Sequence, residues 1–254
     1  MTTNTATRGT LLEELTWVQA ENALSRASLV VVPIGAAAKE HGPHLKLKTD
    51  RVLADYLKGR ILERCDVLIV PTLTYHYYPA FLDYPGSTSL RLKTARDLTI
   101  DVCKSIARYG PRRFYALNTG VSTIRALKAA ATSLAHEGIL LRFTDISKIT
   151  ASFVVQMSAQ KGGTHADEIE TSMMLYIEPA SVDMTKAACD YHPGNGPLRR
   201  TRNGKGVYSP TGIYGDATLA TPYKGKRAVE TLVQGILRDI KDLRGARLHI
   251  RSAE

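Results

Sequence analysis

Four short apolar runs occur in the first 145 residues, and none of them alternates with polar residues. They span residues 29–35, 66–73, 113–118 and 138–145. A strand with one face in water alternates between apolar and polar side chains, whereas a strand buried on both faces does not. The runs therefore predict a mostly parallel sheet that is covered on both sides.

The segments between these runs have apolar residues at helical spacing. One stripe comprises Leu53, Tyr56, Leu57 and Ile61, a second comprises Leu98, Val102 and Ile106 before Gly110-Pro111, and a third comprises Ile124, Leu127, Ala130 and Leu134. A last helix is expected at 226–243. Strands that alternate with helices predict a three-layer αβα sandwich with right-handed crossovers. We expect one α/β domain over residues 1–254, with 178–225 forming active-site or interface loops.

Cysteine content and hydropathy indicate a cellular location. The three cysteines, Cys65, Cys103 and Cys189, are odd in number and widely spaced, so we expect no disulfide framework and buried packing roles. No stretch has the roughly 18 apolar residues that a membrane span needs. The first residues contain no apolar signal-peptide core. We therefore predict a cytoplasmic protein.

The chain has a formal net charge of +10 and a pI near 9.5. Such an excess of positive charge is compatible with nucleic acid or with an anionic small molecule. The one basic cluster, 198–206, has no interleaved aromatic residues to stack on bases. We therefore interpret this cluster as a solvated loop and favour a small-molecule substrate of anionic character.

The first stretch with functional chemistry is GAAAKEHGPHLKLKTD, residues 35–50, which directly follows a predicted strand. Glu40, His41 and Asp50 offer the carboxylate and imidazole groups that divalent metals bind. Asp50 also stands where a helix begins, so N-capping is an alternative role. His44 is equally compatible with a packed or surface position.

The second stretch is NTGVST, residues 118–123, at a predicted strand-to-helix turn. Backbone N–H groups of Gly120, Val121 and Ser122 are candidates to bind an oxyanion or an anionic substrate. A plain connection, with Ser122 or Thr123 as the helix N-cap, is the alternative.

The third stretch is GGTHADEIETSMMLYI, residues 162–177. The spacing of Thr164 and Asp167 predicts a capping box and a helix that starts at His165. Glu170 falls on the apolar stripe of this helix, where a carboxylate needs local compensation, whereas Glu168 is expected to be exposed. His165, Glu168 and Glu170 are our catalytic candidates, and Glu170 is also a candidate metal ligand.

These stretches, together with YPGSTSL (84–90) and GIYGDATLATPYKGK (212–226), resemble the signature blocks of the creatininase family. That family includes creatinine amidohydrolase, a formylamino-pyrimidine deformylase and a mycofactocin-processing peptidase. The resemblance implies an αβα fold, a hexameric assembly and a one- or two-metal site that hydrolyses non-standard C–N bonds. It also shows two departures, since Lys39 stands where the family has a ligand glutamate and Gly120 stands where it has a ligand histidine.

We therefore predict a divergent hydrolase, dependent on one or two divalent ions (Zn, Mn or Fe), that cleaves a non-peptide C–N bond in a small cyclic amide, lactam or formamide. In this hypothesis Glu168 or Glu170 accepts the proton of the attacking water, and His165 orients the substrate or protonates the leaving nitrogen. The alternative is a metal-poor, non-hydrolytic member of the family that binds an anionic metabolite.

Overall fold

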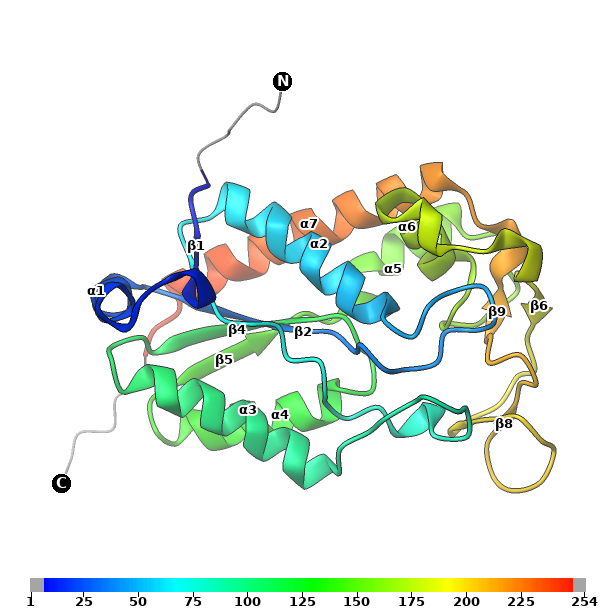
Figure 1. Cartoon of the computed structure of the whole chain (residues 1–254), viewed down its shortest axis with the longest axis horizontal. Helices are drawn as coiled ribbons and strands as arrows, with labels where there is room; N and C mark the ends of the chain where they lie inside the picture. Colours follow the sequence, from blue (N-terminus) through cyan, green and yellow to red (C-terminus); the bar gives the residue numbers. More distant parts are fainter. Residues whose placement is uncertain (1–6, 249–254) are drawn as a thin grey trace.

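The computed structural model describes residues 7–248 and contains a central five-stranded sheet in the order β1-β3-β2-β4-β5 (Figure 1). All four strand pairs are parallel. The strands are β1 (Thr10–Leu11), β2 (Val30–Ile34), β3 (Leu68–Ile69), β4 (Arg113–Asn118) and β5 (Leu140–Phe143). Each predicted apolar run thus contributes one strand of this sheet, whereas its edge strand β1 was not predicted.

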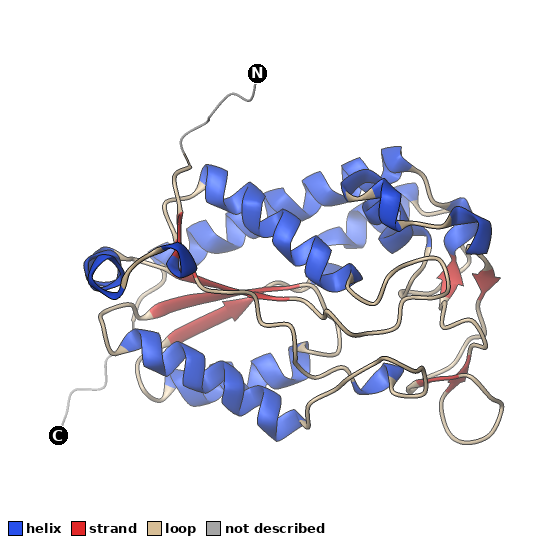
Figure 2. Cartoon of the chain, viewed as in Figure 1, coloured by secondary structure: helices blue, strands red, loops and turns tan. Residues whose placement is uncertain are grey.

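Helices cover both faces of the sheet, and this confirms the predicted three-layer αβα sandwich (Figures 1 and 2). One face carries α2 (Thr49–Arg64), α5 (Ile146–Met157), α6 (Glu168–Ile177) and α7 (Pro222–Gly245). The other face carries α1 (Trp17–Arg26), α3 (Leu92–Ala107) and α4 (Ile124–Ala135). The sequence predicted α2, α3, α4 and α6 from apolar stripes and α7 as a last helix, but missed α1 and α5.

The absence of alternation in β2 has a direct structural cause. Val31 packs into the core beneath α2 and α7, whereas Val30 and Val32 pack into the core on the α3–α4 side. Successive side chains of a strand point to opposite faces, so a sheet with two covered faces requires apolar residues at every position.

Three helix starts differ from the predicted ones. Helix α7 begins at Pro222, four residues before the expected start at 226. Helix α6 begins at Glu168 and not at His165, because the Asp167 side chain accepts hydrogen bonds from the N–H groups of Ile169 and Glu170 as its N-cap. Helix α2 already includes Thr49 and Asp50, and its N-cap residue Lys48 makes no side-chain cap. Asp50 is therefore not the N-cap of this helix.

The loop-rich region 178–225 gathers at one end of the molecule, beyond the carboxyl ends of the sheet strands (Figure 1). Within it, β6 (Cys189–Asp190) pairs with β9 (Gly215–Asp216), and β7 (Leu198–Arg199) pairs with β8 (Val207–Tyr208). The 3₁₀ helices within residues 7–248 are η1 (Leu12–Glu14), η2 (Pro79–Phe81), η3 (Pro179–Ser181), η4 (Met184–Lys186) and η5 (Ala217–Leu219).

Two further features concern the sequence predictions. Among residues 7–248, no helix combines the length and the apolar character required to cross a bilayer. Cys65 and Cys103 are buried as expected, but Cys189 is exposed at the start of β6 and so has no packing role in the core.

Candidate active site

The candidate site lies beyond the carboxyl end of β2, where residues 35–48 form a long loop before α2 (Figure 1). Ligands of open parallel sheets bind at this edge. The loop places Glu40 and His41 against His165, which precedes α6, so residues about 125 apart in the sequence come into contact. An antiparallel bridge between His165 and Tyr214 holds the second segment in place.

His41 is buried, and its two ring nitrogens have different surroundings. Nδ1 donates a hydrogen bond to the Lys39 carbonyl oxygen at 2.9 Å, because a carbonyl oxygen can only accept. In a neutral ring Nε2 then carries a lone pair. It faces Asp50 Oδ1 at 3.1 Å and Glu170 Oε1 at 3.7 Å. Three electron-rich atoms around one point require a cation between them, either a proton or a metal ion.

His165 and Glu40 form a buried pair, with 3.1 Å between Nε2 and Oε2. Burial alone would lower the pKa of the imidazole, but the Glu40 charge and hydrogen bond outweigh it and raise that pKa. Burial likewise favours a higher pKa for Glu40, yet His165 holds it below its ordinary value. Gly212, at a φ of +83°, leaves room for this carboxylate, which a Cβ there would overlap.

Glu170 approaches both histidines from the first turn of α6. Its Oε1 lies 3.7 Å from His41 Nε2, and its Oε2 lies 3.7 Å from His165 Nδ1. Ala166 adopts a φ of +48°, which is costly for a residue with a side chain, and its N–H donates to Glu170 Oε2 at 2.6 Å. The strained backbone therefore helps to hold the carboxylate between the two rings.

His41, His165 and Glu170 together offer three ligand atoms that all lie within 4.8 Å of one another. Two imidazole nitrogens and one carboxylate oxygen are a donor set that suits Zn²⁺, Mn²⁺ or Fe²⁺. Each histidine has its other nitrogen fixed by an oxygen, from the Lys39 carbonyl or from Glu40, which is the usual support of a metal-binding imidazole. The residues present therefore fit one divalent ion.

Asp50 and Glu40 were both predicted as ligands, and the structure places neither in this three-residue group. Glu40 lies behind His165. Asp50 contacts His41 through Oδ1, while its Oδ2 forms an ion pair with Lys39 Nζ at 2.7 Å. Burial would raise the pKa of Asp50, but Lys39 and His41 keep it well below the ordinary range.

Glu168 has a structural position and not the exposed one that the sequence predicted. Its side chain is completely buried, and Oε2 accepts hydrogen bonds from Ser158 Oγ, Ala159 N and Gln160 N at 2.8–2.9 Å. Its Oε1 pairs with Lys224 of α7. With both oxygens occupied, Glu168 ties α6 to the end of α5 and to α7. Glu170, by contrast, keeps 17% of its side chain exposed.

The NTGVST turn lies close to the group but has fewer free donors than predicted. The Gly120 N–H donates to the Asn118 side-chain oxygen at 3.2 Å, and Thr123 binds the same oxygen. Gly120 is therefore occupied within the turn. The remaining predicted donors are the N–H groups of Val121 and Ser122.

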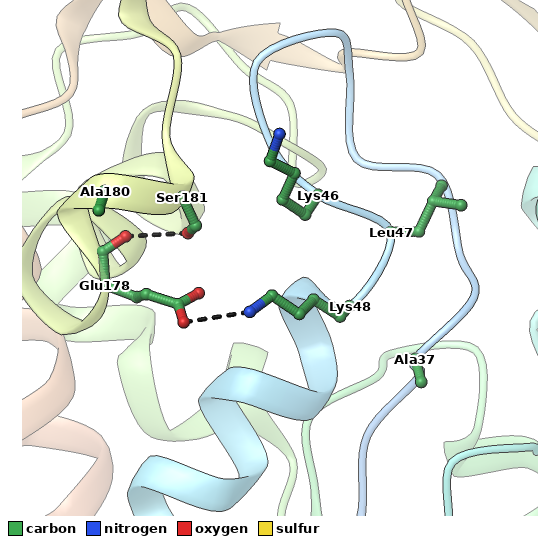
Figure 3. A pocket seen from close by; sticks show the side chains of 7 residues that line it. All are labelled: Ala37, Lys46, Leu47, Lys48, Glu178, Ala180 and Ser181. Carbon is green, nitrogen blue, oxygen red and sulfur yellow. Dashed lines mark hydrogen bonds and ion pairs between the residues drawn. The ribbon is translucent and has the colours of Figure 1, made fainter.

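Two cavities lie near this end of the molecule. One, of about 250 Å³, is lined by Glu170, Thr119, Val121 and Thr164 among others, so it joins the metal-binding group to the NTGVST turn. The other, of about 510 Å³, lies between the 35–48 loop and residues 178–181, where Lys48 pairs with Glu178 (Figure 3). The larger cavity contains none of the three ligands, so the smaller one is the candidate substrate site.

Comparison with known proteins assigns the family. A family model described as "Creatininase: Creatinine amidohydrolase" matches residues 13–240. The chain belongs to the creatininase family. Two relatives are each 28% identical: the mycofactocin precursor peptide peptidase of Mycolicibacterium smegmatis over 85% of this chain and 86% of the relative, and the creatinine amidohydrolase of Pseudomonas putida over 90% and 95%.

Solved structures agree with the fold. A crystal structure of creatinine amidohydrolase superposes with a TM-score of 0.78 at 24% identity and covers 93% of this chain and 98% of that one. A structure described as "Creatininase Mn" gives a TM-score of 0.76 at 25% identity over 92% and 98%. These relatives are named as hydrolases, and the second structure is named with manganese.

Lys39 and Phe81 are site residues that sequence reasoning did not select for a role. The Lys39 ammonium lies 4.7 Å from the centre of the Phe81 ring, and the same ring lies 4.3 Å from the centre of the His165 ring. The signals for Lys39 were its position between Ala38 and Glu40, in a loop rich in metal-binding groups, and its place where the family resemblance puts a ligand glutamate. Nothing in the sequence around Phe81 indicated its place.

Proposed function

We propose that this protein is a divalent-metal-dependent hydrolase that cleaves a non-peptide C–N bond of a small cyclic amide, lactam or formamide. The observation that carries the proposal is the convergence of His41, His165 and Glu170 beside a cavity of about 250 Å³. The hydrolase relatives within the same family support the reaction class.

In this proposal an ion held by His41, His165 and Glu170 would act as a Lewis acid and lower the pKa of a bound water. The chain supplies the remaining functions. Glu40 and the Lys39 carbonyl hold the two imidazoles in position. Glu170 is the one ligand that lines the cavity, so we assign it proton transfer at its carboxylate as well. The N–H groups of Val121 and Ser122 are assigned to the substrate oxygen.

Removal of metal is expected to lower both stability and activity. A ligand that binds only the folded state at a concentration 100 times its Kd adds about 2.7 kcal/mol to the free energy of unfolding. We expect chelator-treated protein to melt below the untreated protein and to recover with Zn²⁺, Mn²⁺ or Fe²⁺. Turnover of a panel of cyclic amides, lactams and formamides should return with the same ion. A protein that contains no metal and shows no melting response to any of the three would refute the proposal.

A metal-free protein that binds an anionic metabolite is the second candidate. It is favoured by one observation, namely that the charge and hydrogen bond of Glu40 outweigh burial and raise the pKa of His165, which favours the imidazolium form of this ring. The same Phe81 ring contacts both His165 and the Lys39 ammonium. Calorimetric binding of small carboxylates or phosphates to chelator-treated protein, without any metal response, would support this candidate in place of the hydrolase.

We further propose that the chain forms a homo-oligomer, a hexamer by its family resemblance, and that it is cytoplasmic with an anionic substrate. Trp17 and Val155 support assembly, because they expose 79% and 85% of their surface in the isolated chain. Light scattering at micromolar concentration is expected to give a mass several times 27.8 kDa. A strict monomer would contradict the assembly.

A further inference from the structure

Lys39 is a buried cation within the site. Its ammonium contacts the Asp50 carboxylate at 2.7 Å and the face of the Phe81 ring at 4.7 Å, and only 4% of the residue is exposed. A lysine pays a large desolvation cost in such a place unless an anion lies beside it. Asp50 supplies that anion. The Lys39 ammonium is therefore a positive charge that already lies next to the metal-binding group.

Asp50 connects this ammonium to the proposed ion. One of its oxygens lies 3.1 Å from His41 Nε2, the atom that faces Glu170, and the other oxygen lies beside Lys39 Nζ. A metal ion that bound Asp50 Oδ2 would have to take the place of the ammonium or lie directly against it. Like charges at such short distance in a buried site repel strongly.

The charges of the site support the same conclusion. Three carboxylates, Glu40, Asp50 and Glu170, surround the two histidines. With both imidazoles neutral, as metal binding requires, the Lys39 ammonium and one divalent ion balance these three negative charges. A second divalent ion would leave two positive charges without compensation in a mostly buried site.

We propose that the Lys39 ammonium takes the place of a second metal ion, so that the centre holds one divalent ion and one organic cation. This inference rests on the proposed function, because it assigns the number of ions at the proposed metal centre. It predicts that the identity of residue 39 sets how many ions each chain binds, independently of turnover.

The test is metal counting by plasma mass spectrometry on protein saturated with Zn²⁺ or Mn²⁺ and then freed of excess ion. Wild type is expected to contain one ion per chain. Lys39→Glu, which adds a carboxylate beside Asp50, and Lys39→Met, which removes only the charge, are expected to bind more than one. Lys39→Arg keeps the charge and should stay at one, as should Lys93→Glu, which makes the same charge change at an exposed position on α3.

Each outcome decides the inference. Two ions in wild type would overturn it and leave the hydrolase proposal standing, as would one ion in wild type and in both charge-removing variants. No ion in wild type would refute the proposed function; the Lys39 assignment would then stand only if the Glu or Met variant gained an ion. Circular dichroism shows which variants fold. If neither Lys39→Glu nor Lys39→Met folds, the number of ions bound by wild type decides the inference alone.

Discussion

Replacing Glu170 with glutamine is expected to abolish stoichiometric metal binding and to lower kcat/KM by about a thousandfold, which corresponds to about 4 kcal/mol of transition-state stabilisation. The amide keeps the volume of the carboxylate and can still accept the Ala166 N–H. It lacks the negative charge that faces His41 and His165. The chelator-treated variant and the chelator-treated wild type should therefore melt within a few degrees of each other.

Steady-state kinetics and metal counting on the same preparations test this prediction. Glu178→Gln is a matched control, because Glu178 also lies near the carboxyl end of the sheet but forms its ion pair with Lys48 at the larger cavity, away from the three ligands (Figure 3). That control should retain its metal and its turnover. Wild-type turnover in the Glu170→Gln variant would show that the carboxylate has no part in catalysis.

Replacing Glu168 with alanine is expected to have the opposite profile, a large loss of stability with one ion still bound per folded chain. The substitution leaves Lys224 and the three donors from Ser158, Ala159 and Gln160 without their acceptor. Removal of one partner of a buried ion pair costs about 3–5 kcal/mol. In a chain of this size that corresponds to a fall of roughly 6–20 °C in Tm.

The pH dependence of this loss provides a second readout. Burial favours a higher pKa for Glu168, but Lys224 and the surrounding donors bring it below its ordinary value. A carboxylate with a lowered folded-state pKa stabilises the protein above its unfolded pKa, near 4.5, and ceases to do so as pH falls through the folded value. The stability difference between wild type and Glu168→Ala should therefore be full at neutral pH and shrink in acid.

Glu137→Ala is the surface control for this experiment, because Glu137 pairs with Lys104 where both side chains are nearly half exposed. Exposed pairs contribute about 0–1 kcal/mol, so this variant should melt close to wild type at every pH. If Glu168→Ala melts like the control, the buried network contributes little and the role assigned to Glu168 is wrong.

The fold followed largely from local sequence patterns. Continuous apolar runs identified β2, β3, β4 and β5, and helical stripes identified α2, α3, α4 and α6. These patterns are reliable because burial on two faces leaves no position of a strand free to be polar. Helix α1 was missed although Thr16 and Gln19 form a capping box, since the helix lies at the edge and buries only Leu24.

The sequence also located the right segments of the site. His41, His165 and Glu170 were all among the predicted residues, because histidine and carboxylate groups beyond the carboxyl ends of parallel strands suit a metal. The role of each carboxylate on α6 was harder to predict. Glu168 and Glu170 are two residues apart on one short helix, and spacing alone assigned the exposed position to Glu168.

Tertiary structure decided which carboxylate became buried. Glu168 faces the end of α5 and Lys224 of α7, partners that lie 8–10 and 56 residues away and have no regular spacing to it. Tertiary structure likewise decided that Asp50 faces the Lys39 ammonium and that Glu40 supports His165. The sequence by itself determined the order of strands and helices and the chemical types available at the sheet edge. Which charge faces which is a property of packing between distant segments, because electrostatic pairing depends on distances that only the assembled layers create.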